Sequence, residues 1–129
     1  MPSRLPDAAL RDILHHIDLA TRLVDGFDQV SFREDVRTLY AVTRCLEIIS
    51  EASRRLPEAM KARHPAIAWR QMASAGNVYR HDNEDVAARF VWQTVQGDLP
   101  TLRSAIAVAL DAAATPGDWP RRQRAPGSR

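Results

Sequence analysis

The longest stretch with a helical apolar repeat runs from Ser31 to Leu56 and reads SFREDVRTLYAVTRCLEIISEASRRL. Ser31 can cap its start, because Glu34 follows three residues later and completes the pattern of a capping box. Residues three and four apart then form one stripe, made of Val36, Leu39, Tyr40, Thr43, Leu46, Ile49, Ser50, Ser53 and Leu56. The pattern predicts a helix of roughly 25 residues, about 37 Å long, as the central element of the fold.

The same spacing predicts helices on both sides of this central stretch. The expected segments are Asp7, as N-cap, to Val24; Glu58 to Arg63; a short helix beginning near Ala68; and Ala87 to Ala113. Asp25-Gly26 should end the first of them, and Pro100 should kink the last or leave one carbonyl unpaired. No window alternates apolar and polar residues long enough for a strand, so the predicted fold class is all-α.

The length of 129 residues and the 45% hydrophobic content suit a single folded domain. We expect this domain to span residues 1–114. Residues 115–129 are rich in proline, glycine and arginine, a composition that predicts a disordered tail. The tail carries four of the 18 basic residues, so the domain itself is close to neutral. The tail is either a solubilising end or a weak RNA-attracting arm, and its sequence does not choose between them.

No apolar run is long enough to span a membrane, and the first residues lack the apolar core of a signal peptide. We therefore expect a cytoplasmic protein without a membrane partner. The single cysteine, Cys45, lies in the central apolar segment, where a buried thiol is the simplest expectation. His15 and His16 are adjacent and diverge on a helix, so they do not form a metal pair. The chain has no phosphate-binding glycine loop, paired cysteines or HExxH motif, and we expect no metal or cofactor.

A polar cluster lies between the last two predicted helices, in Gly76 to Val86, which reads GNVYRHDNEDV. If the residues before Asp82 are helical, Asn77, Arg80 and His81 share one face. An imidazole beside a guanidinium suits RNA cleavage without a metal, since the base can take the 2′-hydroxyl proton while the cation neutralises charge on the phosphate. The alternative is a solvated helix end closing on an Asp-Asn turn.

Glu47 and Glu51 form the other notable polar pair, four residues apart on the central helix. Like charges at this spacing repel each other. One of them is balanced by Arg44, Arg54 or Arg55, or the pair lines the same site as His81. Both alternatives stay open on the sequence alone.

Four further patterns follow one another along the chain. They are Arg44-x-Leu46-Glu47-Ile48-Ile49-x-Glu51-Ala52, Pro65-x-Ile67-x-Trp69-x-x-Met72, Asn77-Val78-x-x-His81, and Val91-Trp92-x-Thr94-Val95-Gln96-x-Asp98-Leu99-Pro100. Together they resemble the HepT-like ribonucleases of the HEPN superfamily. The resemblance covers about Leu10 to Leu110. It implies a four-to-five-helix bundle that forms a homodimer, with the catalytic motifs of two subunits meeting at a cleft.

The resemblance also implies a function, that of the toxin in a type VII toxin–antitoxin pair. Such a toxin is a metal-independent RNase that uses an arginine, then four to six residues, then His-x-Tyr. Its partner is a minimal nucleotidyltransferase antitoxin, which can silence it by AMPylation of the motif tyrosine. On this basis His81 and Arg80 are the catalytic candidates, Asn77 and Asn83 contact substrate, and Glu47 and Glu51 support the site.

Two positions depart from the family pattern. Gly76 stands where the arginine is usual, and Asn83 stands where the tyrosine is usual. Arg80 can supply the missing guanidinium from one turn later, since positions four apart are neighbours on a helix. Asn83 offers no phenolic hydroxyl for AMPylation. Either Asn83 is natural and the protein is weakened or purely a binding protein, or Asn83 is a substitution that relieved toxicity during expression.

Overall fold

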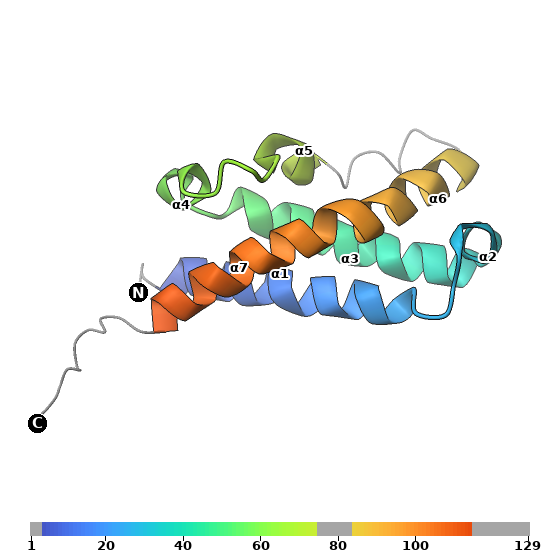
Figure 1. The fold of residues 1–129 in the computed structure, drawn as a ribbon, viewed down its shortest axis with the longest axis horizontal. Coiled ribbons are helices and arrows are strands. Elements are labelled where there is room, and N and C mark those ends of the chain that lie inside the picture. Colours follow the sequence, from blue (N-terminus) through green and yellow to red (C-terminus); the bar gives the residue numbers. More distant parts are fainter. Residues whose placement is uncertain (1–3, 75–83, 115–129) are drawn as a thin grey trace, which may run out of the picture.

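The computed structural model describes residues 4–74 and 84–114, and these two parts are helical and contain no strand. Three long rods run along the molecule in Figure 1: α1 (Arg4–Leu23), α3 (Val36–Arg54) and the continuous pair α6 (Glu84–Gln93) and α7 (Leu99–Ala114). The shorter helices are α2 (Gln29–Glu34), α4 (Glu58–Ala62) and α5 (Trp69–Ser74). The all-α prediction is confirmed for this part of the chain. The predicted tail, residues 115–129, lies outside the described residues.

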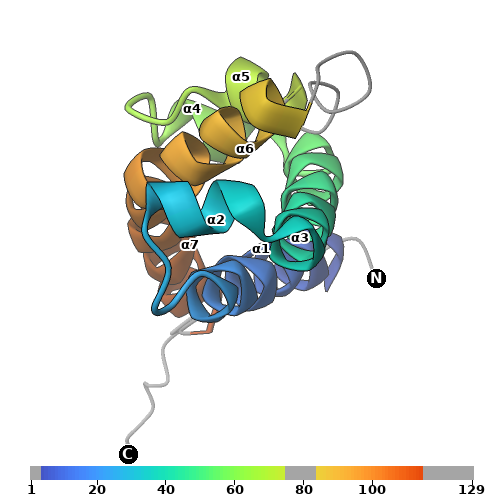
Figure 2. The same ribbon diagram turned by 90° about the vertical axis from the view of Figure 1, so that its right-hand side faces the viewer.

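The long helices surround one apolar core. Figure 2 looks along them and shows α1 between α3 and α7, with α2 across the near end and α4 and α5 on the opposite side from α1. The fully buried large side chains include Leu10, Ile13, Ile17, Phe32, Val42, Leu46, Ile49, Val91, Leu99, Leu102 and Ile106. Because each long helix contributes residues three or four apart, one buried stripe per helix builds the core.

The first helix begins before its predicted start. Asp7 is not the N-cap of α1, which begins at Arg4, and its carboxylate instead forms an ion pair with Arg11 at 3.1 Å. Pro6 does not stop the helix because proline is tolerated in a first turn, where its missing N–H has no partner to lose. The predicted end is confirmed, since Gly26 takes a left-handed backbone with φ +87°.

The predicted central helix is divided in two at Asp35. Asp28, not Ser31, is the N-cap of α2: its carboxylate accepts from the Ser31 amide at 2.8 Å, and the Ser31 hydroxyl accepts from the Asp28 amide at 2.9 Å. Asp35 then takes an extended backbone and caps α3 by accepting from the Thr38 amide at 3.0 Å. Two acidic caps seven positions apart thus start two helices where one was expected.

Two of the first three residues of the predicted central stripe face outward. Val36 and Tyr40 are 45% and 62% exposed, whereas Leu39, Val42 and Leu46 are buried. The buried face of α3 is therefore centred on Leu39, Val42 and Leu46, and α3 packs against α1.

The short helices after α3 agree with the sequence. Pro57 precedes α4 as its cap residue, and α5 begins at Trp69, one position after its predicted start near Ala68. The indole Nε1–H of Trp69 points back along the chain and lies 3.0 Å from the Lys61 carbonyl oxygen and 3.1 Å from that of His64. This shared hydrogen bond ties the start of α5 to the end of α4 and to His64 just after it.

The last predicted helix contains a π-helical turn, Thr94–Asp98, directly before Pro100. Pro100 has no N–H for the carbonyl four residues earlier, and its ring would collide with that carbonyl in a regular helix. The wider turn accommodates both constraints, with the Leu99 amide bonded to the Thr94 carbonyl five residues back. The irregularity expected at Pro100 is confirmed, and it takes this form.

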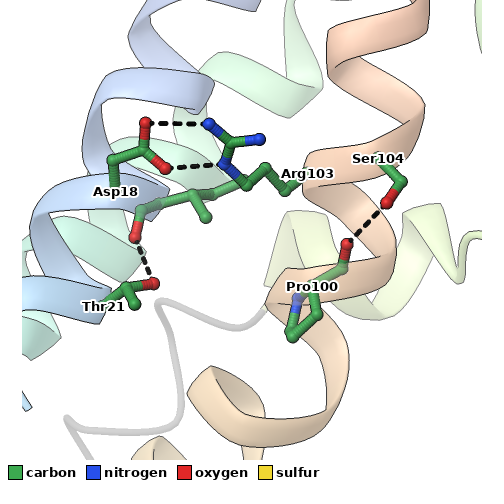
Figure 3. Close-up of polar contacts among 6 residues, drawn as sticks. Asp18, Thr21, Pro100, Arg103 and Ser104 are labelled. Atoms are coloured by element: carbon green, nitrogen blue, oxygen red, sulfur yellow. Dashed lines mark hydrogen bonds and ion pairs between the residues drawn. The ribbon is translucent and has the colours of Figure 1, made fainter. Parts of the chain in front are cut away.

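Figure 3 shows how α7 is held to α1 just beyond this turn. The guanidinium of Arg103 donates two hydrogen bonds to the Asp18 carboxylate, at 2.7 and 3.2 Å, and the Ser104 hydroxyl donates to the Pro100 carbonyl at 3.2 Å. These hydrogen bonds from Arg103 lower the pKa of Asp18 from its ordinary value.

Within the described residues no helix is both long and apolar enough to cross a membrane.

Candidate functional site

The predicted site residues divide into a described and an undescribed group. Asn77, Arg80, His81 and Asn83 all fall in 75–83, outside the residues that the structure describes. Glu47 and Glu51 are described and lie on α3. The structure therefore defines the surroundings from which the 75–83 segment departs, at the end of α5, and to which it returns, at the start of α6.

A polar stripe on α3 faces the α5 side of the bundle. We define the α3 polar stripe as Glu47, Ser50, Glu51 and Arg54, which are spaced so that all four share one helix face. Ser50 is buried, Glu47 is half-buried, and Glu51 and Arg54 are exposed. α5 packs on α3, and Ser50 and Arg54 of this stripe contact it directly.

Two members of the stripe hold the end of α5. The Ser50 hydroxyl donates to the Ala73 carbonyl at 2.6 Å, and Nη1 of Arg54 donates to the same oxygen. Arg54 also lies 3.2 Å from the Ser50 oxygen, so the three groups form one small network. The final carbonyls of a helix lack partners within it, and here the neighbouring helix supplies two. We call this network the Ala73 clamp.

The clamp and the Trp69 hydrogen bonds fix α5 at both ends. The buried side chains of Ile67 and Met72 seat it on the core. Because α5 leads directly into residues 75–83, its fixed position determines where that segment begins. The residues of the Pro65–Met72 pattern thus have structural roles, as core contacts and as anchors of α5.

The acidic pair on α3 is partly balanced by an arginine on the same helix. Nη1 of Arg44 lies 3.3 Å from Oε1 of Glu47, three residues away, whereas Arg55 pairs with Asp12 on α1 at 3.3 Å. Of the three arginines predicted as alternatives, Arg44 is therefore the one that pairs with Glu47. Glu51 is exposed on the next turn, so both carboxylates remain on the stripe beside the Ala73 clamp.

Three other residues were singled out from the sequence: Cys45, His15 and His16. Cys45 is buried, as predicted, and burial raises the pKa of its thiol. The His15 and His16 rings meet edge to face with centroids 4.9 Å apart, and a ring nitrogen of His16 lies 2.7 Å from the Asp12 carbonyl oxygen. In the parts of the chain that the structure describes, no three His, Cys, Asp or Glu side chains gather as metal ligands would.

A cavity of about 380 Å³ opens between α5 and the junction of α6 with α7. Its wall includes the π-helical turn, through Thr94, Gly97 and Asp98. The Thr94 hydroxyl donates to the Phe90 carbonyl at 2.8 Å, which fixes its position in the wall. π-helical turns are rare and often occur at functional sites, so this cavity is a second candidate site.

Neither the clamp nor the cavity was identified from the sequence. Ser50 and Ala73 are 23 residues apart, so no local pattern indicates that they meet. Ser50 and Arg54 were assigned to the apolar stripe and to charge balance, and Asp98 was part of a family pattern without a role. The one available signal was a serine in an apolar stripe, because a buried hydroxyl needs a partner.

Comparison with known proteins identifies one family. The family model described as ribonuclease HepT-like matches residues 13–109. The "Probable ribonuclease HepT" of Thermococcus cleftensis is 38% identical over 97 residues, which cover 72% of this chain and 88% of that protein. A protein of Methanocaldococcus jannaschii that also bears the name of an RNase is 30% identical over 103 residues, covering 80% and 89%. No solved structure gives a significant match.

Proposed function

Because the chain belongs to the ribonuclease HepT-like family, we propose that it is the toxin component of a toxin–antitoxin pair and acts as a metal-independent endoribonuclease in the cytoplasm. The observation that carries this proposal is the family match over residues 13–109, which includes α3, α5 and the whole 75–83 segment. The Ala73 clamp supports it, since a fixed α5 gives the segment with His81 a defined starting point.

The proposed reaction is an attack within the RNA strand. His81 takes the proton from a ribose 2′-hydroxyl, and the 2′-oxygen forms a bond to the adjacent phosphorus. The bond from phosphorus to the 5′-oxygen of the next nucleotide breaks, that oxygen takes a proton from water, and His81 returns its proton to water. The products are a 2′,3′-cyclic phosphate and a free 5′-hydroxyl.

The other predicted residues assist this step. Arg80 neutralises the charge that develops on the phosphate, in place of the arginine that Gly76 lacks. Asn77 orients the substrate and Asn83 contacts it. Glu47 and Glu51 support the site from α3, where an exposed or half-buried carboxylate can hold a cationic side chain of the neighbouring segment. His81 is the residue on which the proposal depends most.

The proposed partners follow from the same family. We propose a homodimer whose two motifs meet at a shared cleft, RNA as substrate, and a minimal nucleotidyltransferase as antitoxin. Asn83 has no hydroxyl that could accept an AMP group, so neutralisation at this position would act through binding. Residues 1–114 would form the functional domain, with 115–129 as a basic tail.

A second function is favoured by the two departures from the family pattern. With Gly76 and Asn83 at the usual arginine and tyrosine positions, the chain could be a helical dimer that binds the nucleotidyltransferase or nucleic acid without cleaving RNA. This alternative predicts partner binding that is unaffected by His81→Ala.

Expression of the protein alone in bacteria separates the two. We expect slowed growth and fragmented RNA with the wild-type chain, a stronger effect after Asn83→Tyr, and neither effect after His81→Ala. His15→Ala is the matched control, since His15 is an exposed histidine on α1. Intact RNA and normal growth with all four proteins would contradict the ribonuclease proposal.

A further inference from the structure

The cavity between α5 and the α6–α7 junction has a composition that selects its ligand. Its volume of about 380 Å³ lies within the range of about 300–1,000 Å³ that small-molecule sites occupy. Most of its lining is apolar, including Ile67, Met72 and Leu102. Asp98 is the one charged residue among the described residues that line it. Because no described lining residue is a cation, the Asp98 carboxylate disfavours phosphate at this wall and favours an uncharged group that donates hydrogen bonds.

The wall of the cavity is preformed. On one side, the Trp69 indole is bonded to the carbonyls of Lys61 and His64, and the Ile67 amide donates to the His64 carbonyl at 3.1 Å. On the other side, Asp98 ends the π-helical turn, in which the Leu99 amide is bonded to the Thr94 carbonyl. Because the wall is already ordered, little free energy is lost in ordering it when a small ligand binds.

From these features we propose that the cavity binds a guanine base of the RNA substrate. Guanine presents two adjacent N–H donors, N1–H and the 2-amino group, to which a carboxylate can bond in the two-pronged manner of charge-assisted pairs. Gln71 also lines the cavity, and a side-chain amide can donate a hydrogen bond to the guanine O6. Phe90, an aromatic residue, lines the same space. Unpaired bases of single-stranded RNA are typically held in this way, by an aromatic contact and hydrogen bonds to the base edge.

This assignment rests on the proposed ribonuclease function and adds a specificity to it. Gln71 and Met72 of the cavity wall belong to α5, the helix that leads into the 75–83 segment. A base held beside α5 would fix the register of the strand relative to His81. Asp98 is then a specificity-determining residue, and cleavage should favour sites near a guanosine.

The binding step can be tested without any cleavage. The full-length chain with labelled methyl groups is titrated with guanosine, inosine and adenosine, and NMR shifts of Ile67, Met72 and Leu102 are followed. Inosine is the matched ligand, because it differs from guanosine only by lacking the 2-amino group. We expect guanosine to bind about tenfold more tightly than inosine, the size of one hydrogen bond to a charged acceptor.

Asp98→Asn should remove this difference, because an amide cannot accept both donors as the carboxylate does. Asp25→Asn is the matched control: it removes the same charge at an exposed turn outside the cavity. Equal affinities for guanosine, inosine and adenosine would overturn the proposal. So would shifts at these methyl groups caused by N-acetylarginine amide but not by guanosine, which would assign the cavity to a basic side chain of a protein partner.

Cleavage mapping on a mixed-sequence RNA keeps this inference separate from the function on which it rests. Cuts clustered near guanosine in the wild type and dispersed after Asp98→Asn support both. RNA cleavage by the wild type with an unchanged pattern after Asp98→Asn overturns the guanine site and leaves the ribonuclease function standing. Guanosine-selective shifts without RNA cleavage support the guanine site and contradict the ribonuclease function.

Discussion

The Ala73 clamp should couple Ser50 and Arg54, because both side chains donate to one carbonyl oxygen. In Ser50→Ala or Arg54→Ala that oxygen keeps one partner, so each single substitution should lower the free energy of unfolding by about 1 kcal/mol, the net value of one hydrogen bond. In the double variant the oxygen loses both partners, and the penalty for an unsatisfied acceptor adds about 1–3 kcal/mol. The double variant should therefore lose more stability than the two single variants together.

The assay is urea denaturation of the four proteins, followed by RNA cleavage rates under conditions where each is folded. Two neighbours provide matched controls on the same helix. Ser53 is buried and donates to a carbonyl of its own helix at 2.7 Å, and Arg55 pairs with Asp12 of α1. If α5 positions the 75–83 segment, the Ser50 and Arg54 variants should lose far more cleavage activity than Ser53→Ala and Arg55→Ala at a similar loss of stability. Additive unfolding free energies, or equal activity losses in clamp and control variants, would refute this reasoning.

Three further predictions concern the fold. Phe32→Ala should lower the free energy of unfolding by about 3–5 kcal/mol in urea, because Phe32 is fully buried against Trp92 with ring centroids 5.4 Å apart; a loss below about 1 kcal/mol would contradict that packing. The hydrogen bonds from Arg103 lower the pKa of Asp18 in the folded protein. The Asp18–Arg103 ion pair therefore stabilises the fold fully above the ordinary pKa of an aspartate, and this stabilisation is lost as the pH falls through the lowered pKa of Asp18. Asp18→Asn should thus be less stable than the wild type at pH 7 and converge with it in acid, and an equal gap at pH 7 and pH 2 would contradict this. Burial raises the pKa of the Cys45 thiol, so a thiol reagent at pH 8 should modify it only after urea is added; rapid labelling of the folded protein would count against its burial.

The helices and most of the core could be predicted from the sequence because apolar spacing is a local signal. Leu39, Leu46, Ile49 and Leu56 of the predicted stripe follow directly from it, and all four are buried. The division at Asp35 did not follow, because the predicted helix runs through this residue and the apolar repeat gives no sign of its extended backbone. The two helices were therefore predicted as one.

The exposed positions of Val36 and Tyr40 could not be predicted either. Both fit a helical repeat with Leu39 and Thr43, and the repeat alone does not fix the centre of the buried face. That centre is set by how α3 packs, chiefly against α1, and it includes the buried residues Val42 and Leu46. Pro100 gave a correct indication of an irregular turn, whereas its π-helical form depends on the packing of residues on both sides.

For the candidate site, residue types in the sequence indicated the chemistry, whereas the contacts that hold α5 became visible only in the structure. His81 and Arg80 were identified by an imidazole beside a guanidinium, and they lie outside the described residues. The Ala73 clamp connects residues 19 and 23 positions apart. Contacts over such separations are determined by how helices pack and leave no periodic trace in the sequence.

The central claim is that His81 catalyses attack by a ribose 2′-hydroxyl without a metal. The most direct test incubates the purified full-length chain with RNA in excess EDTA and identifies the ends of the products. We expect 2′,3′-cyclic phosphate ends with the wild type and with His15→Ala, no products with His81→Ala, and no cleavage at a position that carries a 2′-deoxyribose. Cleavage that His81→Ala leaves unchanged, or that EDTA abolishes, would contradict it.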